Sequence, residues 1–478
     1  MFNGKVSRRG FLLYSGVLAA GALPAFARNE SLAGAVRRVA RDSGVNRLRL
    51  LYPEGALANI NPIVASFSEQ TGIGIELTET LVDDVHTKLL IEHTAGRSRF
   101  DLALPATYSI PDLAEAQAIR DLSRYVVKYE QNLIATPSLY ALGDRYKNRF
   151  YGYQTDGDVY LMFYLRKRLE DPEEKKRYED LFGEPLRLPE TWAELDRIMS
   201  FFHRPDEDQY GGCLFRTPSY MTWEWWIRFH ETGRLPLTDD VAPDFVNDEG
   251  VGALESLLAA SAHQHPSAAT NGLFENWHVF SEGQCAVNIG WGGSQKHFNR
   301  GDSKIKGDML HATTPGASYF NWGWNFVTTS SCRAPELGFL FGLFATRPDV
   351  SLQAVREDGF FDPFREEHYA DDQIASVYGE TFLAAHRRGM RTAIPDFYLS
   401  HRDDYFRSLT HNIELAYHHR ISAEEALRFT AADWERMTER FGRDSQRDQW
   451  RFLKTRYPVR GSHHVGLHVG LHGGDPVA

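Results

Sequence analysis

The sequence predicts an α/β protein built from two lobes. Its first part alternates short apolar strands with amphipathic helices and brief connections, a pattern typical of an open α/β sheet. The chain has 478 residues, more than one hydrophobic core usually organises. A short polar joint, Asp156-Gly157-Asp158, then leads into a second strand that is apolar on both faces. Together these observations indicate two α/β units connected by a bendable segment.

The first unit repeats a strand–helix pattern from residue 47 onward. Asn61-Pro62 and Asp83-Asp84 are typical helix starts, and Gly72 and Gly96 are typical helix ends. We therefore predict strands over residues 47–52, 73–77 and 100–104, helices over 61–71 and 84–96, and a further helix from Pro111.

Two residues at the ends of these strands are candidates for binding a ligand. Ligands of open α/β sheets lie beyond the carboxyl ends of the strands. Glu54 and Tyr108 follow the first and third predicted strands. Ordinary turn chemistry is the alternative explanation for each of them.

The stretch from Tyr151 to Arg168 is the predicted centre of the molecule. Residues 159–165 read VYLMFYL, so that both faces of the strand are apolar or aromatic, as in a central strand covered on each side. Gly157 lets the backbone turn sharply between the candidate binding residues Asp156 and Asp158. The simpler alternative is an ordinary loop before an ordinary core strand.

The second unit continues the alternation and is rich in tryptophan. We predict a helix over 192–202, a strand over 211–215, a helix opening near Trp223, a helix over 337–344 and a helix-rich remainder to Trp450. Seven of the ten tryptophans fall between Trp223 and Trp324. About half of these seven are expected to be structural, because a large ring with a single N–H group usually belongs to a core or an interface.

Glycine-flanked tryptophans point to a carbohydrate. The faces of a pyranose stack on aromatic rings, and its hydroxyl groups need polar partners. Trp291, Trp322 and Trp324 lie between or beside glycines at turns and are candidate binding residues, and we expect the ring of Trp291 to have few side-chain neighbours. Tyr220 and Trp223, at the start of the next helix, are further candidates. Trp192 and Trp434 lie on amphipathic helix faces and are expected to be core residues.

The first 27 residues predict an export signal. Ser7-Arg8-Arg9-Gly10 carries a twin arginine, an apolar run follows over residues 11–22, and Ala25-Phe26-Ala27 offers a cleavage site. The apolar run is too short for a membrane-spanning helix. We therefore expect a mature protein that is soluble in the periplasm or secreted, and we favour the periplasm, with export through the twin-arginine pathway.

Composition excludes several classes of partner. The chain has 53 Lys and Arg against 64 Asp and Glu, a formal net charge of −11, and no basic stretch. Nucleic acid and anionic membranes are therefore poor candidates for partners. Three cysteines form no disulfide framework, and we expect Cys213, Cys285 and Cys332 to be buried thiols.

Several segments resemble family 1 of the extracellular solute-binding proteins, which includes the maltodextrin-binding proteins and feeds ATP-driven sugar importers. The resemblance is carried by residues 67–126, by the joint and the residues after it to 198, and by FSEGQCAVNIGWGGS over 280–294. It extends to about Tyr457, with extra residues around 171–189. It implies a type II periplasmic-binding-protein fold with the ligand in the cleft between the lobes.

The resemblance also implies an arrangement of lobes. The first lobe is expected to comprise residues 46–154 and 325–362, and the second residues 155–324 and 363–457. The chain would then cross between lobes three times, which permits closure around a ligand. Asp362 and Arg365 would lie on the third crossing, and Tyr405 would present a ring to the cleft.

Residues 458–478 form a tail rich in His and Gly. His463, His464, His468 and His472 could converge on a metal ion. Disorder without function is the favoured interpretation. We predict neither a metal nor a cofactor for this protein.

Three functions are compatible with these features. The first is a periplasmic receptor that captures a sugar, glycoside or polyol and delivers it to an ABC permease. The second is a carbohydrate-active enzyme using a carboxylate pair drawn from Asp156, Asp158, Glu224 and Asp362. The third is a metal carrier that uses the tail. No phosphate-binding loop, zinc motif or nucleophile elbow occurs in the sequence. We favour a monomeric receptor for a neutral carbohydrate.

Overall fold

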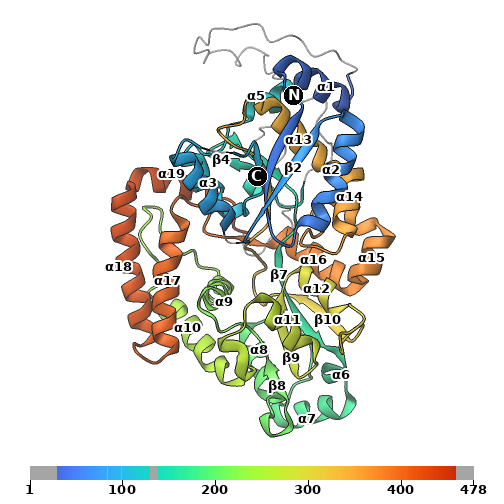
Figure 1. Cartoon of the computed structure of the whole chain (residues 1–478). Helices are drawn as coiled ribbons and strands as arrows, with labels where there is room; N and C mark the ends of the chain where they lie inside the picture. The colour runs from blue at the N-terminus through green and yellow to red at the C-terminus, as the bar shows by residue number, and fades with distance from the viewer. Residues whose placement is uncertain (1–29, 83, 98, 130–137, 459–478) are drawn as a thin grey trace, which may run out of the picture.

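The computed structural model describes residues 30–82, 84–97, 99–129 and 138–458. It shows two α/β lobes, one above the other, each built on its own sheet (Figure 1). The predicted export signal, Asp83 and all four histidines of the tail lie outside the described residues. Within those residues, no helix has the length and apolar character needed to cross a membrane.

The first sheet has the strand order β2-β1-β3-β12-β6. Its strands are β1 (Arg47–Pro53), β2 (Gly74–Thr80), β3 (Leu102–Ala103), β6 (Gly152–Gln154) and β12 (Asn325–Thr328). β1 is parallel to β2 and β3, whereas β12 is antiparallel to β3 and β6. Leu48, Leu50 and Leu51 of β1 are completely buried. This is the open α/β sheet that the first part of the sequence predicts.

Helices cover both faces of the first sheet. They are α1 (Leu32–Ser43), α2 (Leu57–Thr71), α3 (Asp84–Thr94), α4 (Ile110–Glu115), α5 (Ser123–Lys128), α13 (Pro335–Ala345) and α14 (Pro348–Arg356). Phe67 of α2 packs edge-on against Phe341 and Phe344 of α13, at 5.1 and 5.2 Å between ring centres. The predicted start of α2 was wrong. Pro62 lies inside the helix, because the Ile60 amide already closes the first turn on the Ala56 carbonyl.

The second sheet is centred on the strand that the sequence singles out. Its order is β13-β11-β7-β9-β8, and β10 pairs with β7 beside β11. The strands are β7 (Val159–Leu165), β8 (Tyr210–Gly212), β9 (Cys285–Gly290), β10 (Met309–Thr313), β11 (Tyr319–Phe320) and β13 (Ile394–Pro395). All seven residues of β7 are buried, as its two apolar faces predict. Outside both sheets, β4 (Arg145–Tyr146) and β5 (Arg149–Phe150) form a small antiparallel pair.

Twelve helices of the described chain surround the second sheet or extend from it. They are α6 (Arg166–Leu169), α7 (Pro172–Phe182), α8 (Trp192–Phe202), α9 (Pro218–Glu231), α10 (Asp248–Ala260), α11 (Leu273–Ser281), α12 (Gly292–Phe298), α15 (Asp372–Tyr378), α16 (Glu380–Thr392), α17 (Arg402–Tyr417), α18 (Ala423–Phe441) and α19 (Arg443–Lys454). A capping box of Thr191 and Glu194 starts α8 where it was predicted. The predicted start of α9 near Trp223 was late, because Pro218 supplies its first turn.

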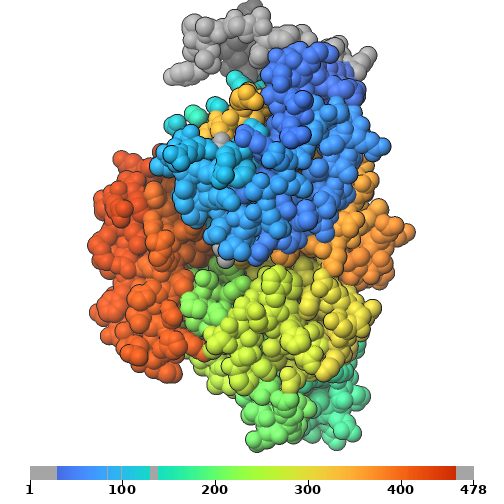
Figure 2. All heavy atoms as spheres, in the orientation of Figure 1, coloured from blue at the N-terminus to red at the C-terminus, as the bar shows by residue number. Residues whose placement is uncertain are grey.

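The C-terminal helices flank both lobes. α17 packs on α9 and α18, and the C-terminal segment that holds α17 and α18 lies along one side of the molecule, in red (Figure 2). Links to the first lobe come from the amide of His401, which donates to Asp112 Oδ1 at 2.6 Å, and from Arg402, whose guanidinium lies 4.4 Å from the ring centre of Tyr108. The three cysteines are buried free thiols, as predicted.

Three segments connect the two lobes. Residues 155–158 join β6 to β7, residues 321–324 join β11 to β12, and residues 357–371 join α14 to α15. Gly157 is needed here for a reason that the sequence does not reveal. Its backbone is not left-handed, but a Cβ atom would lie 2.1 Å from the carbonyl oxygen of Pro363. Glycine at 157 therefore lets the first and third crossings touch.

Candidate binding site between the lobes

A small aromatic pocket lies where the crossings meet the second sheet. Its volume is about 50 Å³. Val82 comes from the first lobe, Leu273 and Trp277 come from α11, and the other lining residues lie on the crossings or directly after β9. The lining residues are Val82, Asp158, Leu273, Trp277, Trp291, Gly293, Trp322, Trp324 and Phe360.

Trp291 is the anchor of the aromatic wall. It follows β9 and precedes α12, and 5% of its surface is exposed. Its Nε1 donates to Asn321 Oδ1 at 2.9 Å, and its ring centre lies 4.5 Å from that of Tyr160. The prediction of a ring with few neighbours was wrong. The flanking glycine admits a different group, because a Cβ at Gly292 would lie 2.3 Å from the carboxyl carbon of Asp362.

The other predicted aromatics gather around Trp322. Its ring centre lies 5.5 Å from Trp223, 6.1 Å from Trp291 and 6.4 Å from Tyr108. Tyr220 joins the cluster through Trp223, at 4.9 Å. Trp322, Tyr108 and Tyr220 are partly exposed, whereas Trp223 and Trp291 are buried. The structure thus brings together five aromatic residues that are scattered over more than two hundred positions of the sequence.

Asp156, Asp158 and Asp362 form a buried carboxyl cluster beneath this wall. One oxygen from each lies within 4.8 Å of the others. Asp156 Oδ1 accepts the amides of Gly157 and Asp362, both at 2.7 Å, and Asp158 Oδ2 accepts the amide of Gly323 at 3.2 Å. Within the described residues, this cluster is the group of carboxylates and imidazoles close enough to share a metal ion. The amide donors already aimed at its oxygens make it a less open site for a metal.

Burial and mutual repulsion keep these carboxyls easy to protonate. Burial, and then the charge of Asp362, raise the pKa of Asp158 to about 7. Burial also raises the pKa of Asp362 to about 6, against the opposing effect of the Lys296 ammonium and the hydroxyl of Tyr378. The pKa of Asp156 is raised well above its usual value, first by burial and then by the charges of Asp158 and Asp362. The cluster therefore changes its charge near neutral pH.

Lys296 is close enough to this cluster for its charge to lower the pKa of Asp158 and Asp362, but its donors bind backbone carbonyls. Its Nζ donates to the carbonyls of Glu357, Gly359 and Phe361 at 2.8, 3.0 and 3.0 Å. Burial lowers the pKa of Lys296, and the nearby carboxylates raise it again. Lys296 therefore fixes the third crossing on α12 while offsetting part of the negative charge of the cluster.

Comparison with known proteins assigns this architecture to a family. Residues 62–377 match the family model described as bacterial extracellular solute-binding protein. The chain belongs to the bacterial extracellular solute-binding proteins.

Two sequence relatives cover this solute-binding protein in part. A mannitol-binding protein of Pseudomonas aeruginosa is 26% identical over 268 residues, which are 52% of this chain and 58% of that one. A probable amino-acid ABC transporter periplasmic-binding protein of Sinorhizobium fredii is 24% identical over 319 residues, 64% of this chain and 69% of that one. The matched region therefore spans about 58–69% of the length of these relatives.

Solved structures of sugar and polyol complexes share the fold. The maltose-bound MalE3 of T. maritima has a TM-score of 0.69 at 16% identity, covering 82% of this chain and 99% of that one. A solute-binding protein of Agrobacterium vitis with bound D-mannitol has a TM-score of 0.65 at 15% identity, with 83% and 99% covered. The two-lobed fold predicted from the sequence is confirmed.

Three of the predicted binding residues lie away from the pocket of this solute-binding protein. Glu54 is exposed, although the neighbouring Gly55 packs against the Phe360 ring. Arg365 is buried and faces Glu367 at 3.7 Å. Tyr405 is 2% exposed, and its hydroxyl is bonded to Thr438 within the C-terminal helices. Arg365 and Tyr405 are thus held by contacts inside the protein, whereas Glu54 is exposed directly after the end of β1.

One of the four acidic residues considered for a catalytic carboxylate pair, Glu224, does not lie at the pocket. Glu224 lies inside the second lobe, where it accepts from Arg216 at 2.7 Å and from Arg228 at 2.9 Å. Arg228 also forms two bonds of 2.7 Å to Asp196. Glu224 thus belongs to a buried ion-pair network and not to the pocket.

Sequence reasoning missed several residues of the site. Trp277 and Phe360 line the pocket, Asn321 holds Trp291, and Tyr160 supports the ring of Trp291 from β7. Trp277 carried a signal, because it belongs to the tryptophan-rich region between 223 and 324. The others look like ordinary core or turn residues in the sequence.

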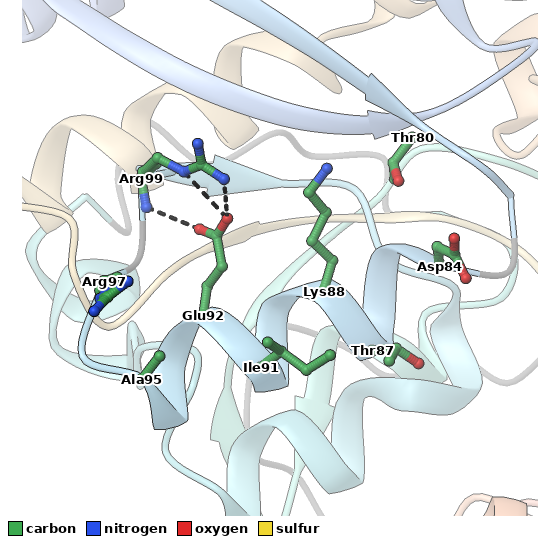
Figure 3. A pocket seen from close by; sticks show the side chains of 9 residues that line it. All are labelled: Thr80, Asp84, Thr87, Lys88, Ile91, Glu92, Ala95, Arg97 and Arg99. Atoms are coloured by element: carbon green, nitrogen blue, oxygen red, sulfur yellow. Dashed lines mark hydrogen bonds and ion pairs between the residues drawn. The ribbon is translucent and has the colours of Figure 1, made fainter.

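A larger surface hollow of about 680 Å³ lies on α3 of the first lobe. Figure 3 shows its side chains, with Glu92 paired to Arg99 at 3.0 Å and Lys88 rising beside them. Its lining residues are Thr80, Asp84, Thr87, Lys88, Ile91, Glu92, Ala95, Arg97 and Arg99. None of them is aromatic, so the hollow offers no ring for a sugar to stack on.

Proposed function

We propose that this solute-binding protein captures a sugar, glycoside or polyol between its lobes and delivers it to an ABC importer. The observation that carries the proposal is the pocket itself, which is lined by four tryptophans and by one acidic residue of the first crossing, Asp158. Aromatic rings offer stacking surfaces to the C–H faces of a sugar or polyol, and an acidic side chain offers a partner to one of its polar groups. The mannitol-binding relative and the maltose and mannitol complexes of similar structures support this substrate class.

Capture proceeds through opening and closure of the lobes. The pocket volume of about 50 Å³ is far below the roughly 300–1,000 Å³ of small-molecule pockets. A sugar therefore enters when the lobes are apart, and closure then brings Val82 of the first lobe against the tryptophans of the second. Contacts made by both lobes at once favour the closed form over the open one.

Delivery requires the protein to reach the outer side of the inner membrane. Family membership supports an extracytoplasmic location. We propose the periplasm, with residues 1–27 acting as a twin-arginine export signal, and a monomeric receptor that meets the permease subunits in its closed form. No chemical step is assigned to the protein, and no cofactor enters the proposal.

Isothermal titration of the full mature chain tests this function. The panel contains maltose, D-mannitol, ribitol and D-tagatose, with leucine and glutamate as amino-acid controls. Saturable binding of a carbohydrate, without binding of the amino acids, supports the proposal. Binding confined to amino acids contradicts it. The same samples are assayed for cleavage of glycosides, and turnover would favour the carbohydrate-active enzyme instead.

A further inference from the structure

The pocket is unusually poor in polar groups for a site that takes a neutral carbohydrate. Among the described residues that line it, Asp158 is the one charged side chain, and the others are tryptophan, phenylalanine, valine, leucine and glycine. A polyol or hexose carries many hydroxyl groups, and each of them loses hydrogen bonds to water on burial. The Trp291 Nε1 is already used by Asn321. The pocket therefore offers few hydrogen-bond partners to the hydroxyl groups of a bound carbohydrate.

The walls are better suited to a cation. Trp291, Trp322 and Trp324 line the pocket, and the negative face of an indole attracts an ammonium or guanidinium group within about 6 Å. Trp277 adds a fourth indole, and its buried Nε1 has no hydrogen-bond partner. Aromatic boxes of this kind recognise organic ammonium groups.

The electrostatic environment also favours a positive charge. Asp158 adjoins Asp156 and Asp362, and all three are at least 91% buried, where charges interact strongly. The nearby cation, Lys296, directs its donors to three backbone carbonyls. Arg365 lies against Glu367 and does not line the pocket. An ammonium group beside Asp158 would therefore meet a negative field that the charge of Lys296 offsets only in part.

We propose that the ligand carries an ammonium group, which the tryptophan walls surround and Asp158 pairs with, so that the substrate class is an amino sugar or amino polyol. This inference rests on the proposed carbohydrate-binding function and replaces the neutral ligand expected from the sequence. The sequence could not reveal that Arg365 turns away or that the three aspartates converge.

Matched ligand pairs test the inference directly. D-glucose is compared with D-glucosamine, and D-sorbitol with 1-amino-1-deoxy-D-sorbitol, by isothermal titration of the wild-type chain at neutral pH. Each pair differs by one hydroxyl replaced by an ammonium group. We expect the amine of at least one pair to bind about tenfold tighter or more than its neutral partner.

The outcomes separate this inference from the proposed function. Carbohydrates that bind while no amine exceeds its neutral partner would overturn the inference and leave the carbohydrate receptor standing. No binding of any carbohydrate, neutral or amino, would overturn both. Tighter binding of an amine supports both.

The Asp158→Asn variant tests whether Asp158 causes the preference for an amine over its neutral partner. The substitution keeps the size of the side chain and removes its charge. We expect the ratio of amine to neutral affinity to fall to about one, because the charge pair is lost. Asp444→Asn is the control, since the Asp444 side chain is 92% exposed on α19. Circular dichroism and the thermal midpoint confirm folding of both variants. An amine preference that survives in folded Asp158→Asn would contradict the role of Asp158.

Discussion

Asp156 Oδ1 accepts the backbone amide of Asp362 at 2.7 Å, which ties the first crossing between the lobes to the third. Asp158, two residues later, accepts the amide of Gly323 at 3.2 Å on the second crossing. One short acidic segment therefore joins all three connections. Because Asp158 also lines the pocket, the hinge and the binding site are the same place. Under the proposed closure, a ligand that contacts Asp158 would act directly on the connection between the lobes.

The close contact between the first and third crossings should make any side chain at position 157 destabilising. We expect Gly157→Ala to lower the free energy of unfolding by about 1–3 kcal/mol, because the new methyl group would lie 2.1 Å from the Pro363 carbonyl oxygen. Ligand affinity should fall as well, since Asp156 and Asp158 flank the displaced backbone. Urea unfolding and titration with the best ligand of the panel measure the two effects.

Gly252→Ala is the matched control for this substitution. Gly252 lies inside α10, and a Cβ there meets nothing within 4 Å. Alanine should stabilise that helix by roughly 0.5–1 kcal/mol and leave affinity unchanged. Equal effects of the two substitutions would show that close approach at Gly157 has no importance.

Periodicity in the sequence predicted the scaffold well, because alternation and helical spacing report directly on burial. Residues 159–165 form β7 with both faces buried, and residues 192–202 form α8 with the predicted limits. The residues of the predicted joint, Asp156–Asp158, lie between β6 of the first sheet and β7 of the second. These features depend on neighbours within a few positions.

The site was predicted in part, because contacts between distant segments decide it. Trp291, Trp322 and Trp324 do line the pocket, but the glycine beside Trp291 makes room for Asp362, about seventy positions away. No local pattern distinguishes a glycine that frees a ring from one that admits a carboxyl group. Tyr405 shows the same limit, because the packing of α17 on α18 removes it from the cleft.

The buried carboxyls should make stability depend on pH in an unusual direction. The pKa of Asp158 is raised to about 7 and that of Asp362 to about 6, whereas an unfolded aspartate titrates near pH 4. Between these values the folded protein binds more protons than the unfolded chain, so the free energy of unfolding falls as pH rises. Each group contributes a slope of at most about 1.4 kcal/mol per pH unit.

Asp362→Asn isolates this effect. The variant loses one titrating group and also removes a charge that raises the pKa of Asp158. Relative to the wild type, it should therefore gain stability as pH rises from about 4 to 7. The buried Asp144, whose pKa is raised to about 7, is present in both proteins and cancels in the difference. Urea unfolding at several pH values measures it, and parallel stability curves would contradict the prediction.

Ligand binding should change the overall dimensions of the protein. The pocket of about 50 Å³ cannot receive a sugar without separation of the lobes, and three crossings permit that motion. We expect small-angle X-ray scattering to show a smaller radius of gyration with saturating ligand than without it. A non-binding sugar from the panel serves as the control. An unchanged radius at saturation, verified by titration, would indicate a rigid cleft.

Export tests the proposed location. Replacing both Arg8 and Arg9 by Lys preserves the charge of the N-terminal segment but removes the arginine pair that the pathway reads. We expect the precursor to accumulate in the cytoplasm, as measured by fractionation and immunoblotting. A single Lys5→Arg substitution is the control. Normal periplasmic amounts of the double variant would argue against the twin-arginine route.

Two tryptophans of the pocket should respond differently to truncation. Trp291 is 5% exposed, packs against Tyr160 and is bonded to Asn321, so Trp291→Ala should cost roughly 3–5 kcal/mol of stability together with affinity. Trp322 is partly exposed, and its Nε1 has no hydrogen-bond partner. Trp322→Ala should therefore cost less stability, while binding weakens by about 1–3 kcal/mol, by analogy with the stacking of bases on aromatic rings.

Trp291→Ala and Trp322→Ala together distinguish a tryptophan that stabilises the fold from one that contacts the ligand. Thermal midpoints without ligand report the first, and dissociation constants of the folded protein report the second. Trp434→Ala provides the structural reference, because its ring is completely buried among the C-terminal helices and its Nε1 donates to the Tyr405 carbonyl at 2.8 Å. It should lower the midpoint and leave the affinity of the folded fraction intact. If Trp322→Ala, like Trp434→Ala, lowers the thermal midpoint and leaves the dissociation constant unchanged, Trp322 does not contact the ligand. The aromatic pocket would then not be the binding site.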